Sequence, residues 1–257
     1  MKRIISLTAL AVLVSIILSS VLVMSYTWYY PDSPRAYIIE GNEDDIATYS
    51  DGGKIIDLKA CSIVGAPGVG DDEAKVRFIG SCYGECVNGV WDTVIFKYIL
   101  YGRILEQAVV TSGSIDVEAY LRIEVYCEDL NEGRIATVGS KTHSPPPGSS
   151  EVAYNAAPFL VDGDVAFCYD HLYSVDVYIT AYTYAHINAP TGSGFSKAIT
   201  NFANAYDNST WSKIVWDYVD VDVLEPVVVE VAQHFIMMKQ EFVTSCLEHY
   251  RGISYYH

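Results

Sequence analysis

The chain has 257 residues, of which 51% are hydrophobic, and its 32 acidic against 16 basic side chains give a formal net charge of −16. An apolar fraction of this size can form a substantial core, which argues against an intrinsically disordered chain. The acidic balance leaves no basic patch that would neutralise phosphates, so it argues against nucleic acid and anionic lipid as partners.

The first predicted element is an export segment. Lys2 and Arg3 precede an uncharged apolar run over residues 4–24, and this arrangement directs a protein into the export pathway. Cleavage near the end of the run is favoured, but the run is also long enough to be retained as a membrane anchor or filament-core helix. We therefore predict a signal peptide or N-terminal apolar helix over residues 1–25. Residues 26–257 are expected to be extracellular, with the membrane contacted only through the N-terminal segment.

Alternation of apolar and polar residues predicts the strands of the body. The clearest case is residues 114–127, where Ile, Val, Ala, Leu and Cys side chains share one face and polar side chains share the other. Such alternation is typical of a half-buried strand in an antiparallel sheet. Residues 172–185 and 213–223 repeat the pattern. Shorter predicted strands cover residues 55–64, 75–80, 93–104, 134–138 and 165–169.

Turn-rich stretches separate these strands, and the C-terminus follows a different pattern. Residues 145–150, "PPPGSS", are either a linker between two small domains or, as we favour, a long surface loop. After Pro226 the apolar residues recur at three- and four-residue spacing, which predicts an amphipathic helix over residues 226–250. The expected fold is all-β: one antiparallel β-sandwich with an N-terminal export helix and one C-terminal amphipathic helix.

Cysteine usage fits an exported protein. An even set in such a chain favours up to three disulfides, with 15 possible connectivities, over small buried thiols. The six candidates are Cys61, Cys82, Cys86, Cys127, Cys168 and Cys246.

No catalytic motif is recognisable. The six histidines lack metal-ligand spacing, which favours solvated or core histidines, and no G-x-S-x-G stretch occurs. The densest acidic stretches are candidates for Ca²⁺ because carboxylates are hard oxygen ligands, and the chosen site is Asp71, Asp72 and Glu73. No other cofactor is expected. Asn208 begins an N-glycosylation sequon, "NST".

Three stretches resemble a known family. They are "TWYYPDS" at residues 27–33, "ATYSDGGKIIDL" at residues 47–58 and "TSGSIDVEAYLRIEVY" at residues 111–126. Together they are similar to the secreted filament proteins of the camelysin/TasA type, which include the archaeal bundling pilins.

The resemblance implies a jelly-roll-like sandwich that forms a homopolymer, a pilus or fibre on an archaeal cell surface, without a catalytic role. Assembly would proceed by donor-strand complementation, in which the N-terminal strand adds to an exposed sheet edge of the next subunit. An ordinary first strand of the subunit's own sheet, or a flexible tether, is the alternative for this segment. The implied subunit contacts are Tyr26, Trp28, Tyr30 and Tyr37.

Other functions remain open from the sequence. The stretch "SVLVMSYTW" also resembles archaeal type IV-like pilins, which retain the N-terminal helix. A membrane-anchored or secreted binding module for Ca²⁺ or glycans is an alternative of a different class, and a secreted hydrolase is a third. Outward Tyr178, Tyr182 and Tyr184 suit subunit contacts, because tyrosine offers large contact area at low entropy cost. They equally suit cross-strand pairing on a solvated sheet.

Overall fold

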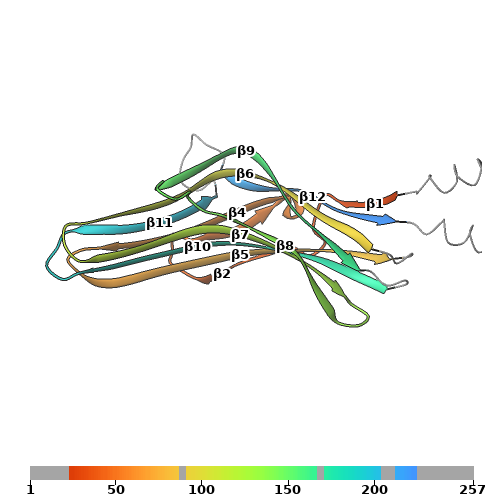
Figure 1. Cartoon of the computed structure of the whole chain (residues 1–257), viewed down its shortest axis with the longest axis horizontal. Coiled ribbons are helices and arrows are strands. Elements are labelled where there is room, and N and C mark those ends of the chain that lie inside the picture. Colours follow the sequence, from red (N-terminus) through yellow and green to blue (C-terminus); the bar gives the residue numbers. More distant parts are fainter. Residues whose placement is uncertain (1–22, 87–90, 167–170, 204–211, 225–257) are drawn as a thin grey trace, which may run out of the picture.

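The computed structural model describes residues 23–86, 91–166, 171–203 and 212–224. Two antiparallel sheets pack face to face into an elongated sandwich (Figure 1). The described residues include no helix that is both long enough and apolar enough to cross a membrane. The predicted all-β antiparallel sandwich is confirmed for this part of the chain.

The larger sheet has seven strands and the smaller has five. The seven-stranded sheet comprises β1 (Val23–Trp28), β3 (Ile46–Ser50), β4 (Ile55–Gly65), β6 (Trp91–Val110), β9 (Glu151–Ala166), β11 (Gly194–Phe202) and β12 (Lys213–Leu224). The five-stranded sheet has the order β2 (Arg35–Glu40), β5 (Gly68–Cys86), β10 (His171–Ala189), β7 (Ser114–Asp129) and β8 (Arg134–His143). A short 3-10 turn, η1 (Asp51–Gly53), follows β3.

The long strand β6 organises the larger sheet. It pairs with β9 along one side, and with β11 and then β12 along the other, so these two strands lie end to end. At one end of the sandwich three connections meet, where the amides of Ala66 and Thr111 donate to the carbonyls of Gly194 and Ser193 at 2.9 Å each. At the opposite end Val23 of β1 pairs with Leu224 of β12 (Figure 1).

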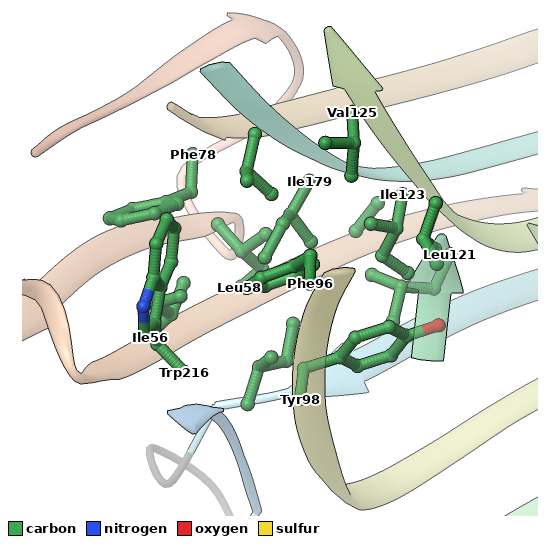
Figure 2. Packing of buried hydrophobic residues seen from close by; sticks show 14 of the residues in the cluster. Ile56, Leu58, Phe78, Phe96, Tyr98, Leu121, Ile123, Val125, Ile179 and Trp216 are labelled. Atoms are coloured by element: carbon green, nitrogen blue, oxygen red, sulfur yellow. The ribbon is translucent and has the colours of Figure 1, made fainter. Parts of the chain in front are cut away.

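The core lies between the sheets and follows from the period-two pattern. On β7 the side chains of Ala119, Leu121, Ile123 and Val125 are fully buried, as the alternation of residues 114–127 predicts. Figure 2 shows Leu121, Ile123 and Val125 of this row together with apolar side chains of the other sheet, among them Leu58 and Phe96. Burial of one face of each sheet is the main driving force that holds the two layers together.

Large aromatic side chains fill the centre of the core. Trp216 of β12 lies against Phe78 of the opposite sheet and Phe96 of its own, with ring centroids 6.5 and 4.7 Å away (Figure 2). Gly80 is required beneath it, since a Cβ there would approach the indole ring to 2.7 Å. Further along the core, the Tyr98 hydroxyl and His143 Nε2 are hydrogen-bonded at 2.7 Å and are buried.

Most predicted strands are confirmed, but several extend further than expected. Residues 75–80 and 93–104 are only parts of β5 and β6. Only four residues separate the end of β10 from Gly194, where β11 begins. Residues 144–150 connect β8 of one sheet to β9 of the other, across the surface.

The first described strand begins within the predicted N-terminal segment. A signal peptide or helix was expected to reach residue 25, but residues 23–25 belong to β1, which pairs with β12. Valine, tyrosine, threonine and tryptophan favour strands, and the side of β12 away from β6 offers a free edge to pair with. Residues 1–22 and the helix expected over 226–250 lie outside the described residues.

Candidate functional site

The outer surface of the five-stranded sheet carries a cluster of tyrosines. Because neighbouring strands are in register, alternate residues from three strands point away from the core and lie side by side. We call this surface the tyrosine face, and its members are Tyr37 on β2, Tyr120 and Tyr126 on β7, and Tyr178, Tyr182 and Tyr184 on β10.

The rings of the tyrosine face contact one another. Tyr182 lies directly opposite Tyr120 across the β10–β7 ladder, and the two rings stack with centroids 4.8 Å apart and an interplanar angle of 26°. Tyr178 and Tyr126 meet edge to face at 5.6 Å. Tyr178 and Tyr182 are four residues apart on one strand, so the two pairs are separated by roughly 13 Å along the sheet. The face therefore presents two aromatic platforms in line.

Basic side chains lie between the two platforms. Thr180, the residue between Tyr178 and Tyr182 on the same face, pairs with Arg77 on one side and Arg122 on the other. Arg77 donates from Nε to the Thr180 hydroxyl at 3.1 Å, and its guanidinium lies 5.7 Å from the centroid of the Tyr178 ring. Arg122 is ion-paired to Glu124 at 3.0 Å. The centre of the face is thus a hydrogen-bonding, positively charged band.

One end of the same face is acidic. Glu73 and Glu118 flank Tyr184. In the next outward row, two residues further along each strand, Asp71 and Asp116 flank His186. The Tyr184 and His186 rings are nearly parallel, with centroids 6.5 Å apart. Carboxylates therefore gather at this end of the face, the arginines lie at its centre, and Glu124 and Asp176 follow on the other side.

The phenols of the stacked pair are held in their neutral form. Burial, and then the neighbouring Glu73 carboxylate, raise the pKa of Tyr182 to about 12. Burial and Glu118 also raise the pKa of Tyr120. Both hydroxyls are consequently protonated throughout the physiological range and can donate as well as accept hydrogen bonds.

A buried acid–histidine pair elsewhere has a structural role. The Asp129 carboxylate lies 2.8 Å from His171 Nδ1 and also accepts the backbone amides of Asn131 and Glu132 at 2.9 and 3.1 Å. These contacts fix the turn between β7 and β8 against the start of β10. Asp129 thus closes a turn, as an Asx motif does.

The expected donor-strand residues are divided between the two sheets. Tyr26 and Trp28 belong to β1 at the edge of the larger sheet, and Tyr30 lies in the connection that follows, 46% exposed with Lys54 over its ring. Tyr37 lies on β2 of the smaller sheet. In this chain the segment is therefore not one strand, and its first part pairs with the chain's own β12.

Up to three disulfides were predicted, and none is seen among the cysteines whose side chains the structure describes. No disulfide joins Cys61, Cys82 and Cys127 to one another. Cys82 and Cys127 both flank Val175, which places their Cα atoms two strand spacings, or about 10 Å, apart, beyond the reach of a disulfide. Cys61 belongs to the other sheet. The side chains of the remaining candidates, Cys86, Cys168 and Cys246, lie outside the described residues.

The predicted calcium ligands do not converge. Asp71 and Glu73 lie on one face of β5, whereas Asp72 between them faces the other way and accepts the Ile63 amide at 2.9 Å. Strand geometry separates the set, because adjacent residues point to opposite faces. Among the described residues no group of three or more His, Cys, Asp or Glu side chains is placed to hold a metal ion. The Asn208 sequon lies outside the described residues.

Comparison with known proteins gives structural likeness at low identity. No family model and no curated protein matches the chain. TmCBM61, solved in complex with beta-1,4-galactotriose, is 11% identical over 67% of this chain and 91% of its own, with a TM-score of 0.29. The K1 cleaved adhesin domain of Lys-gingipain from Porphyromonas gingivalis W83 is 12% identical over 77% of this chain and 97% of its own, with a TM-score of 0.30. A carbohydrate-binding module specific for non-crystalline cellulose, CBM28, is 14% identical over 65% of this chain and 93% of its own, with a TM-score of 0.24. Scores this low carry no argument about function.

Proposed function

We propose that the tyrosine face binds glycans, so that the protein is an extracellular carbohydrate-binding module. The observation that carries the proposal is the stacked pair of Tyr120 and Tyr182 on an outer sheet surface, ringed by hydrogen-bonding side chains. Extracellular placement is supported by the basic residues and apolar run at the start of the sequence.

Sugar chemistry matches the two components of this face. One side of a pyranose ring presents C–H groups, whose weakly positive hydrogens suit the negative face of an aromatic ring. The sugar hydroxyls require donors and acceptors beside the rings, which Arg77 and Glu124 supply. A binding site of this kind needs aromatic contact area together with a few fixed polar groups. Stacking and cross-strand pairing already fix the rotamers of the rings, so binding a ligand costs little additional side-chain conformational entropy.

A protein partner is a poorer match to the same surface. The centres of protein interfaces are depleted in charged residues, whereas this face has arginines at its centre and four carboxylates at one end. Aliphatic side chains are also scarce on it. Mixed charge around half-buried rings is better suited to a polyhydroxylated ligand, which offers a hydroxyl to each polar group.

Replacing Tyr182 by alanine should lower affinity for a bound oligosaccharide about tenfold, because it removes half of the stacked platform. Glycan-array screening of the full-length protein identifies the ligand, and calorimetry measures the loss. Tyr29→Ala is the matched control, since Tyr29 is 56% exposed but lies in the β1–β2 connection, away from the face. Equal affinities for the Tyr182→Ala and Tyr29→Ala variants would contradict the proposal.

A second candidate function is a filament subunit that exchanges β1 between copies. It is favoured by the position of β1, a strand of six residues at a sheet edge that pairs only with β12 in the described part of the chain. Strand exchange would replace this pairing with the same pairing in trans.

A cross-link distinguishes the two states of β1. Thr27 and Asp220 are directly paired, and the Thr27 hydroxyl donates to the Asp220 carboxylate at 2.9 Å. If copies exchange β1, oxidation of a Thr27→Cys/Asp220→Cys variant gives a ladder of covalent oligomers on a non-reducing gel, and neither single variant does. A product that remains entirely monomeric would rule out exchange and leave β1 as the first strand of its own sheet.

A further inference from the structure

The tyrosine face contains an uncommon concentration of arginine for so acidic a chain. Three of the five arginines among the described residues, Arg35, Arg77 and Arg122, lie on it, although acidic residues outnumber basic ones by 32 to 16. Arg77 and Arg122 occupy one cross-strand row with Thr180 between them. We call these two side chains the arginine pair.

Arg77 is positioned but not neutralised. Its Nε donates to the Thr180 hydroxyl, and its guanidinium lies over the Tyr178 ring. These two contacts fix the direction of the side chain. In the part of the chain that the structure describes, no carboxylate lies within ion-pair distance of Arg77. Its terminal nitrogens therefore retain donors for a ligand, in the fork geometry that suits carboxylate and sulfate groups.

Arg122 is placed to contact the same ligand. Its side chain is 47% exposed, and one terminal nitrogen is held by Glu124. The Cα atoms of the arginine pair are two strand spacings, about 10 Å, apart, and each side chain is long enough to reach toward the space above Thr180. The stacked Tyr120–Tyr182 platform begins at the next outward row, two residues along each strand.

We propose that the arginine pair binds the carboxylate or sulfate group of an acidic sugar whose neighbouring neutral residue packs against the Tyr120–Tyr182 pair. This inference rests on the proposed glycan binding and specifies its ligand class. The position of the anion follows from charge complementarity at the centre of the face, and the position of the neutral sugar follows from the adjacent platform.

The acidic end of the face limits the charge that the ligand can carry. Glu73 and Glu118 lie four residues from the arginine pair on their strands, roughly 13 Å away. This distance exceeds the screening length of about 8 Å at physiological salt, so an anion held by the arginine pair is little affected, whereas a chain with an anion on every sugar also brings charge directly over the acidic end and is repelled there. The face therefore selects isolated acidic residues in an otherwise neutral glycan over uniform polyanions.

The test compares three probes on the full-length protein by calorimetry. They are a trisaccharide with one glucuronate and two neutral hexoses, the same trisaccharide with that carboxyl reduced to the alcohol, and inorganic sulfate. We expect the acidic trisaccharide to bind about tenfold more tightly than the reduced one, with the difference shrinking as salt is raised. Arg77→Gln should abolish that difference, because the carboxylate then gains nothing over the hydroxyl, and should lower affinity for the reduced trisaccharide only by the loss of a hydrogen-bond donor.

Arg134→Gln is the matched control, because Arg134 is exposed at the start of β8, away from the tyrosine face, and is ion-paired to Glu132. Equal binding of the acidic and reduced trisaccharides to the wild type would overturn the arginine-pair inference while the glycan-binding proposal stands. Inorganic sulfate binding as tightly as the acidic trisaccharide would also overturn it, since the site would then hold an adventitious ion only. If neither trisaccharide binds and the glycan array is blank, glycan binding itself fails, and the inference fails with it.

Discussion

Replacing Trp216 by alanine is expected to lower the free energy of unfolding by about 3–5 kcal/mol, the range for large aromatic deletions in a core. The side chain is fully buried and spans the two sheets. Its indole nitrogen also donates to the Trp28 carbonyl at 3.5 Å, which links β12 to the end of β1. The cavity would lie above Gly80, which has no side chain to fill it. Denaturant titration followed by far-UV circular dichroism measures the loss.

Two further variants test this explanation. Trp216→Phe retains part of the volume and should cost less than the alanine variant, whereas Ile63→Ala, at a position 54% exposed on β4, should change stability by about 0.5 kcal/mol or less. If Trp216→Ala unfolds at the same denaturant concentration as Ile63→Ala, the contact between the sheets at Trp216 is not the centre of the core.

The strands with strict alternation are those that the sequence could predict. In β7 and β10 each inward apolar residue is followed by an outward polar or tyrosine residue, because one face of the five-stranded sheet is buried and the other is in solvent. β9 was largely missed, since Pro158 and a mixed pattern interrupt it and it is an edge strand with little burial. β11 was hidden by the Gly- and Pro-rich residues that precede it.

The candidate site could be predicted only in part, because its geometry depends on register. Alternation along β10 indicates that Tyr178, Tyr182 and Tyr184 share an outward face. Nothing within one strand shows that Tyr120 lies opposite Tyr182, or that Arg77 and Arg122 flank Thr180. These juxtapositions come from pairing between segments some 60 to 100 residues apart in the sequence. The outward arginines were the available signal, and they were overlooked because the net charge of the chain is so negative.

His143 should make the protein less stable at mildly acidic pH. Burial away from water, with a smaller contribution from Lys141, lowers the pKa of His143 from 6.5 to about 4. The unfolded chain therefore binds a proton near pH 6.5, whereas the folded protein does so only near pH 4. Stability is complete above pH 6.5 and falls as the pH drops between these values, by about 3 kcal/mol in total.

Buried carboxyl groups act in the opposite direction and must be separated from this effect. Burial raises the pKa of Asp45, Asp57 and Glu106, so these groups favour the folded state as the pH falls. A double variant, Tyr98→Phe/His143→Phe, retains all of them and removes only the histidine and its hydroxyl partner. The difference in unfolding free energy between the wild type and this double variant should fall by about 3 kcal/mol from pH 6.5 to pH 4.

The single variants show why both members of the pair must be changed together. His143→Phe leaves the buried Tyr98 hydroxyl without its acceptor, and this should cost about 1–3 kcal/mol at neutral pH, whereas the double variant should recover most of the loss. The rings of Tyr154 and Phe159 already surround His143 with centroids 5.4 and 4.4 Å away, so a phenyl ring fits the site. A difference curve that is flat from pH 6.5 to pH 4 would mean that water or an acceptor reaches His143 in the folded protein, and that its imidazole is not held neutral by burial.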